Sequence, residues 1–408
     1  MREIFSLRNY NKKIIGDLSY TIIASLIFYA VTQLIVYPLI NRQMGASYLG
    51  NVVYFVSVVT IISQPIGLSF CANRLRLKQH ISANNGDYLL ILSYYIAFAV
   101  AFAAFFSSFV LPISDIILFI LYVATYILRL YATLEFRLTL NFKGLLIQTV
   151  ILVGGYLLGL LLFFITGIWM IIFLAGETSA ILYVLLRGSI FNYEKRTGLY
   201  NSIITKSVFM LILSNLVDVL IINGDKIIIR NMLDPFTVSV FFVVSMIGKT
   251  LAMLVGPIKN VSVSHLAVNN TLVTRTMFIK SLGLYCLLGA TFYIFCIVAT
   301  PLYVRLFYPD LLQHIGTLNL IVNAAQILIF VSSLLLMIMF VPLGPGSNMI
   351  IQLIFISIYL PLAIFMTGIF GVEGFAYALL FASILRLVLV TVIGLWKLPR
   401  TISEGACG

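Results

Sequence analysis

The chain has few charged residues for its length. Only 9% of its 408 residues are Asp, Glu, Lys or Arg, whereas 62% are hydrophobic, and the mean hydropathy is +1.12. A soluble globular domain is about one quarter charged, and no soluble core could bury this much apolar surface. The composition therefore excludes a soluble domain and predicts an all-α polytopic membrane protein.

Cysteine, histidine and long hydrophilic loops are scarce as well. The four cysteines and three histidines follow no metal-binding or redox spacing, so no metal or other cofactor is expected. The longest hydrophilic connections, 188–206 and 259–275, are too short to fold into a catalytic domain. These absences argue against an enzyme.

Long apolar runs make up most of the chain. A transmembrane helix needs about 20 consecutive, mostly apolar residues, and the sequence contains twelve such runs. The predicted spans are Leu18 to Ile40, Tyr48 to Phe70, Tyr88 to Leu111, Ile116 to Phe136, Gly144 to Thr166, Ile168 to Leu186, Ser207 to Ile229, Phe236 to Ile258, Ile279 to Tyr303, Gly316 to Phe340, Met349 to Phe370 and Gly374 to Trp396.

The basic residues are divided unevenly between the two sides of these spans. Of the 25 Lys and Arg residues, 18 fall in the termini and loops of one side and four on the other. The positive-inside rule places the more basic side in the cytoplasm, so both termini are expected to be cytoplasmic. The net charge of +12 then reflects topology. Nucleic-acid binding would need a soluble basic face and is not expected.

Segments near the start of each half of the chain are alike. Arg42-Gln43-Met44 corresponds to Arg230-Asn231-Met232, and Tyr54 corresponds to Phe242 at the same offset. The similarity predicts an internal duplication, with an N-terminal lobe of six spans at 1–206 and a C-terminal lobe of six spans at 207–408. Transporters with such repeats bind their substrate between them, which predicts a central cavity.

Five charged residues fall well inside the predicted spans: Arg129, Glu177, Asp218, Lys249 and Arg386. Each costs about 2.5–3.5 kcal/mol at the centre of a bilayer, so they should face the bundle interior or a wet cavity. If each acid pairs with a base, one positive charge remains, and this charge suits an anionic ligand. Arginine suits phosphate in particular because its hydrogen bonds can be bidentate.

Two interpretations of these charges stay open. In the first, the basic residues contact substrate (Arg129, Lys249 and Arg386), and the acidic residues couple transport to protons or cations (Glu177 and Asp218). In the second, all five form structural ion pairs that hold helices together.

Polar residues also recur at helical spacing inside the spans. Asn319, Asn323 and Gln326 share one face of the tenth span, and Asp218 and Asp225 lie along one side of the seventh. Such stripes either line a cavity and contact substrate or join helices by hydrogen bonds, and both interpretations stay open.

Short motifs at corresponding places in the two halves carry a resemblance to a known family. They are Gly224 to Ile229 with Leu233 and Val238 to Phe242 in the second half, and Pro38, Arg42, Gly45, Tyr48 to Gly50 and Tyr54 in the first. Together with twelve spans, cytoplasmic ends and short loops, they resemble the Wzx-type polysaccharide (O-antigen) flippases of the multidrug/oligosaccharidyl-lipid/polysaccharide exporter superfamily. The layout covers almost the whole chain, whereas the motifs are short and degenerate.

The resemblance implies a flippase of the bacterial inner membrane. It would move undecaprenyl-diphosphate-linked oligosaccharide, a unit of lipopolysaccharide or a similar surface glycan, to the outer leaflet by alternating access. Surplus cations would meet the diphosphate, polar stripes would meet the sugars, and the prenyl tail would stay in the lipid bilayer. Ion-gradient coupling, as in an antiporter, would involve Asp218 or Glu177. Other membrane proteins of glycan assembly are possible partners.

The family has no invariant catalytic set. Only Arg42 and Asp225 carry over by motif, as residues of structural turns.

Two alternatives to a flippase stay open. A multidrug exporter of the same fold would bind amphipathic cations and should have an acidic cavity, which the three-to-two basic excess disfavours. A membrane-embedded glycan polymerase or acyltransferase is disfavoured because the sequence has no large outer loop.

Overall fold

The computed structural model describes residues 2–78, 83–192, 194–253 and 274–399. Within these ranges the chain is helical and contains no β-strand. Among the described residues, eleven helical stretches are long and apolar enough to cross a membrane. The predicted fold class, an all-α polytopic membrane protein, is confirmed.

Helix packing divides the chain into two compact units. Unit 1 consists of Met1–Ile40 and Phe55–Gly224, and unit 2 consists of Asn41–Tyr54 and Asp225–Gly408. Two of the boundaries fall inside long helices, so each of those helices belongs partly to both units. The predicted lobes, 1–206 and 207–408, and the cavity between them stay predictions.

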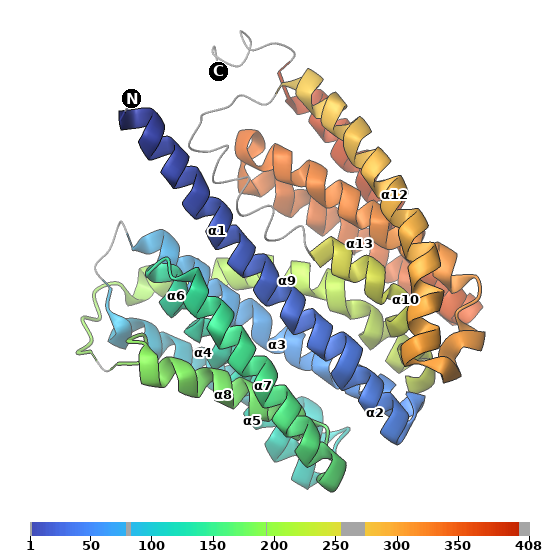
Figure 1. The fold of residues 1–408 in the computed structure, drawn as a ribbon, viewed down its shortest axis with the longest axis horizontal. Coiled ribbons are helices and arrows are strands. Elements are labelled where there is room, and N and C mark those ends of the chain that lie inside the picture. Colours follow the sequence, from blue (N-terminus) through green and yellow to red (C-terminus); the bar gives the residue numbers. More distant parts are fainter. Residues whose placement is uncertain (1, 79–82, 193, 254–273, 400–408) are drawn as a thin grey trace. The chain divides into compact units, whose positions relative to one another are not determined.

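Unit 1 contains most of the helices of the first half and the first part of the long helix that follows them (Figure 1). Its elements are α1 (Arg2–Val31), the π-helical turn η1 (Thr32–Val36), most of α2 (Tyr37–Met44), most of α3 (Ala46–Leu77), α4 (Asn85–Ser108), α5 (Ile113–Ala132), α6 (Leu134–Leu138), α7 (Phe142–Thr166), α8 (Met170–Arg187) and α9 (Asn201–Met232) as far as Gly224.

Two glycines allow α7 and α8 to pack closely. A Cβ atom added at Gly155 would lie 2.6 Å from the Cα of Gly176, and one added at Gly159 would lie 2.6 Å from the Cα of Ile172. Glycines one turn apart are a common means of close helix contact in membranes. The contact holds α8 at a fixed position along α7, and both helices carry residues of the candidate site.

Unit 2 is built around the last and longest helix. It contains residues 41–54, the end of α9, α10 (Pro235–Met253), α12 (Arg275–Phe307), the short 3-10 helix η2 (Pro309–His314) and α13 (Leu318–Lys397). Both α10 and α12 pack along α13 (Figure 1).

Helix α13 is continuous by its hydrogen bonds but folds back on itself. Gly371 has a φ of 62°, in the left-handed region that favours glycine. A Cβ atom at Gly374 would lie 2.1 Å from the carbonyl oxygen of Met366. The rings of Tyr359 and Phe375 are 6.1 Å apart, whereas 16 residues of straight helix would span about 24 Å. The stretch Ile350–Lys397 therefore makes two passes, which with the other ten candidate spans gives the twelve predicted passes.

The turn between the seventh and eighth passes falls within the predicted gap, 230–235. Helix α9 continues to Met232, and Leu233 and Asp234 separate it from α10. The Asp234 carboxylate accepts hydrogen bonds from the Thr237 N–H at 2.9 Å and from its hydroxyl at 2.7 Å, an N-terminal cap that Pro235 completes. Asp225 thus lies within a helix rather than in the turn. The predicted end of the eighth span, 254–258, lies outside the described residues.

Candidate functional site

Two of the charged residues predicted inside spans form a buried ion pair in unit 1. The Nε of Arg129, on α5, lies 2.5 Å from Oε2 of Glu177, on α8. The hydroxyl of Tyr156, on α7, donates to Oε1 of Glu177 at 2.9 Å. The guanidinium carbon of Arg129 also lies 4.8 Å from the ring centre of Tyr126, a cation-π distance. Three helices therefore meet at one carboxylate.

This arrangement favours a structural role for the pair. Glu177 is 0% exposed, and each of its carboxylate oxygens accepts a hydrogen bond. The charge of Arg129 is balanced by Glu177, so the pair adds no surplus charge to unit 1. Substrate binding by Arg129 and ion coupling by Glu177 stay proposals. The sequence analysis did not single out Tyr156, although a tyrosine within a mostly apolar span is a signal of a buried polar partner.

Unit 2 contains a second buried group of charges, in which two lysines share one aspartate. The ammonium of Lys249, on α10, bonds to Oδ2 of Asp225, on α9. The ammonium of Lys226 lies 3.6 Å from Oδ1 of the same carboxylate. The side chains of Lys249, Lys226 and Asp225 are 13%, 9% and 3% exposed. This basic cluster of Asp225, Lys226 and Lys249 carries a formal charge of +1.

Arg386 adds a further positive charge to unit 2. It lies in the last pass of α13 and is 3% exposed. Its Nη2 donates to the hydroxyl of Ser333 at 3.2 Å, and its guanidinium carbon lies 5.4 Å from the ring centre of Phe355. Three passes of α13 therefore meet around one guanidinium.

The interior of unit 2 is formally basic. Among the residues of unit 2 that the structure describes, Asp225 is the only buried acid, because Asp234, Asp310 and Glu373 are exposed. Three basic groups, Lys226, Lys249 and Arg386, are set against this one carboxylate, which gives a formal surplus of +2.

The amides of the tenth pass join helices. The side-chain amide of Asn319 donates to the carbonyl oxygen of Ile297, on α12, at 3.1 Å. That of Asn323 donates to the hydroxyl of Thr300 at 3.3 Å and to the Asn319 side-chain oxygen at 2.8 Å. Asn319, Asn323 and Gln326 are all buried. The hydrogen bonds favour helix joining for Asn319 and Asn323, and their contact with substrate stays a proposal.

The amide stripe also packs against α10 next to the basic cluster. A Cβ atom at Gly248 would lie 2.8 Å from the Cβ of Gln326 and 3.0 Å from Oδ1 of Asn323. Gly248 precedes Lys249, so the structure brings α10 with its lysine and the amides of α13 into one region of unit 2. The Oδ1 atoms of Asn323 and Asp225 are buried there without a hydrogen-bond donor.

The remaining predicted residues lie elsewhere. Asp218 is half-buried on the part of α9 that belongs to unit 1, three residues after Asn215, whose side chain donates to the Ser69 hydroxyl at 2.8 Å. Arg42, in the last turn of α2, donates to the carbonyl oxygen of Leu306 at 3.3 Å, near the C-terminal end of α12. A cation at a helix C-terminus is favourable because of the helix dipole.

Asp225 and Lys226 were not predicted to be part of the basic cluster. Asp225 was assigned to a structural turn, and Lys226 was not singled out. The available signal was the Asp234-Pro235-Phe236-Thr237 run, which has the residues of a helix N-terminus and locates the turn after Met232.

Comparison of the whole chain with known proteins gives a similarity of fold. No protein-family model matches the chain, and no curated protein sequence matches it. Among solved structures, the inward closed conformation of the lipid II flippase MurJ has a TM-score of 0.70 at 13% identity, over 93% of this chain and 87% of that one.

Other solved structures with this fold are described as transporters. The inward-facing conformation of a multidrug resistance MATE family transporter of the MOP superfamily has a TM-score of 0.65 at 13% identity, over 91% and 93% of the two chains. A MOP superfamily transporter from Pyrococcus furiosus, described by a reverse polarity of its binding pocket, has a TM-score of 0.64 at 15% identity, over 93% and 94%. The chain thus has the fold of MOP superfamily transporters.

Proposed function

We propose that the protein is a transporter of the MOP superfamily that flips undecaprenyl-diphosphate-linked oligosaccharide across the bacterial inner membrane. The observation that carries the proposal is the basic interior of unit 2, where Lys226 and Lys249 share the carboxylate of Asp225 and Arg386 adds a further buried positive charge. A surplus of buried positive charge suits an anionic ligand, and lysine and arginine are both common phosphate ligands. The fold shared with a lipid II flippase supports a lipid-linked substrate.

Within this proposal the residues have different roles. Lys249 and Arg386 bind the diphosphate, and Asn319, Asn323 and Gln326 support that site. Asp218 couples transport to an ion gradient. Glu177 is the weaker candidate for coupling because its two oxygens already hold Arg129 and Tyr156. Transport moves the substrate without covalent chemistry, so no enzymatic step is proposed.

A multidrug exporter is the second candidate, because MATE transporters share the fold. Amphipathic cations would be repelled by a basic interior, which makes this candidate the less favoured one.

The central test measures where the lipid-linked oligosaccharide accumulates. Deletion of the gene should leave it on the inner leaflet, and the wild-type gene should restore it to the outer leaflet. Lys249→Ala and Arg386→Ala should each fail to restore it at normal protein level. Lys280→Ala is the matched control, because Lys280 is an exposed lysine of α12 in the same unit. Normal glycan display in both test variants would remove the anion-binding proposal, and loss of drug resistance alone would favour the exporter.

A separate test addresses orientation in the membrane. In the proposed topology Arg196 is cytoplasmic and Asp310 is external. Single cysteines at these positions should react with an impermeant maleimide only from the corresponding side. The opposite pattern would invert the topology.

A further inference from the structure

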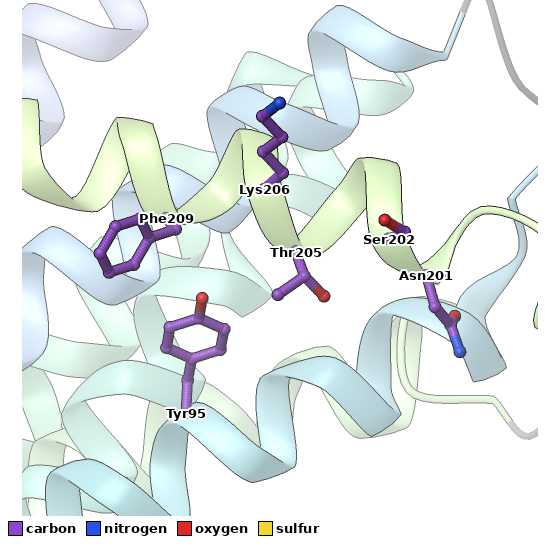
Figure 2. Close-up of a pocket in the computed structure, with 6 residues that line it drawn as sticks. All are labelled: Tyr95, Asn201, Ser202, Thr205, Lys206 and Phe209. Atoms are coloured by element: carbon purple, nitrogen blue, oxygen red, sulfur yellow. The ribbon is translucent and has the colours of Figure 1, made fainter.

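An open groove lies in unit 1 between α4 and the first turns of α9 (Figure 2). Its volume is about 510 Å³. It is lined by Tyr95 of α4 and by five residues of α9: Asn201, Ser202, Thr205, Lys206 and Phe209. Figure 2 shows Thr205 and Asn201 directed from α9 towards α4, and Lys206 at the rim with its amine pointing away from Tyr95.

The connection before α9 fixes the two walls of this groove. The carboxylate of Asp87, in the first turn of α4, accepts hydrogen bonds from the Thr197 N–H at 2.9 Å, the Thr197 hydroxyl at 2.7 Å and the Gly198 N–H at 3.0 Å. Helix α9 begins only three residues after Gly198, at Asn201. The first turns of α4 and α9 are therefore held at the same level.

In the proposed topology, in which the seventh span begins at Ser207, the groove would extend from the membrane surface into the apolar layer. From Asn201 to Phe209 the rise along α9 is about 12 Å. The headgroup layer on each side of a bilayer is roughly 5–8 Å thick. Because the predicted span begins at Ser207, the polar residues from Asn201 to Lys206 are expected at headgroup depth. Phe209 lies deeper, where acyl chains begin.

The chemistry of the lining changes along the same direction. Lys206 supplies a positive charge, and Ser202 and Thr205 supply hydroxyl donors. The six lining residues include no acid, and the first turn of α9 has none either, so the N–H groups of a 32-residue helix add positive potential. At the deeper end, the rings of Tyr95 and Phe209 are suited to an acyl chain.

We propose that this groove binds one anionic phospholipid, with its phosphodiester at the rim beside Lys206 and Ser202, which share one face of α9, and an acyl chain along Phe209 and Tyr95. Charge complementarity selects an anionic lipid, because a zwitterionic headgroup would bring a second positive charge against Lys206. In the proposed topology the lipid belongs to the cytoplasmic leaflet. It would fasten the start of α9 to α4 independently of the transported substrate.

Native mass spectrometry of the full chain in detergent tests this site. The purified protein is titrated with dioleoyl phosphatidylglycerol or with dioleoyl phosphatidylcholine. Wild type should retain one phosphatidylglycerol in preference to phosphatidylcholine. Lys206→Gln or Ser202→Ala should lower that retention about tenfold, the effect of losing one charge-assisted hydrogen bond to phosphate.

Lys143→Gln is the matched control, because Lys143 is an exposed lysine at the start of α7. It should leave retention unchanged. The melting temperature in lipid-free detergent checks that the variants are folded, and Ser202→Ala carries the test if Lys206→Gln is not folded. Equal retention of the two lipids, or unchanged retention in folded variants, would mean that the groove holds only bulk lipid and would overturn the proposal. Displacement of phosphatidylglycerol by equimolar undecaprenyl phosphate would also overturn it, because the groove would then belong to the substrate.

Discussion

The ion pair between Arg129 and Glu177 gives the sharpest test of the structure. Replacement of Arg129 by methionine keeps most of the side-chain volume but removes the charge next to a carboxylate that is 0% exposed. Loss of one partner of a buried ion pair costs about 3–5 kcal/mol, because the remaining charge is stranded. Tyr156→Phe removes a single hydrogen bond to the same carboxylate and should cost about 1.5–3 kcal/mol.

The double variant Arg129→Met with Glu177→Met provides the decisive comparison. Replacement of a whole buried pair by apolar side chains is often neutral or stabilising. We expect the double variant to recover most of the stability that Arg129→Met loses. Equilibrium unfolding in mixed micelles measures the free energies. A single variant as stable as wild type, or a double variant no more stable than the single one, would refute the reasoning.

The same double variant also distinguishes a structural role of the ion pair from a role in ion coupling. If the pair only joins α5, α7 and α8, the folded double variant should still transport. A stable double variant that has lost its dependence on the ion gradient would instead assign coupling to Glu177.

Three further predictions concern helix packing, helix capping and a loop contact around the sites. Gly50→Ala should strongly destabilise the protein, because its Cβ would lie 1.7 Å from the carbonyl oxygen of Pro235; the melting temperature measures this, and an unchanged value would contradict the packing of this turn. Asp234→Ala should cost about 1 kcal/mol by loss of the cap on α10, whereas Thr237→Val, which keeps the N–H bond, should cost less. Asp87→Asn should weaken the hold on the connection before α9, so limited trypsin digestion there should become faster; an unchanged digestion rate would contradict this role.

Much of the fold follows from the sequence because it depends on local properties. Twelve apolar runs predict twelve passes, since each run must satisfy its backbone hydrogen bonds internally within the bilayer. The fold-back at Gly371 agrees with the predicted break between the eleventh and twelfth spans. The assignment of Asp225 to a structural turn, which the resemblance implied, was wrong, because in the structure Asp225 and Lys226 are buried within α9.

The candidate site was predictable only in part. The sequence singled out Arg129, Glu177 and Lys249 because charges inside apolar runs are costly and need partners. It could not say that Arg129 is balanced by Glu177 while Lys249 shares Asp225 with Lys226. Which residues of different helices meet depends on how each helix is rotated about its axis. Periodicity within one span shows which residues share a face, but it does not show which neighbouring helix that face contacts.

The sequence by itself determined that this is a membrane protein, how many times it passes through the bilayer, and that charged residues lie inside the spans, where they are energetically costly. These follow from composition and from runs of neighbouring residues. Only the tertiary structure decided which charges cancel and which remain as a surplus. That outcome depends on contacts between residues far apart in the chain, such as Arg129 and Glu177, which are 48 positions apart.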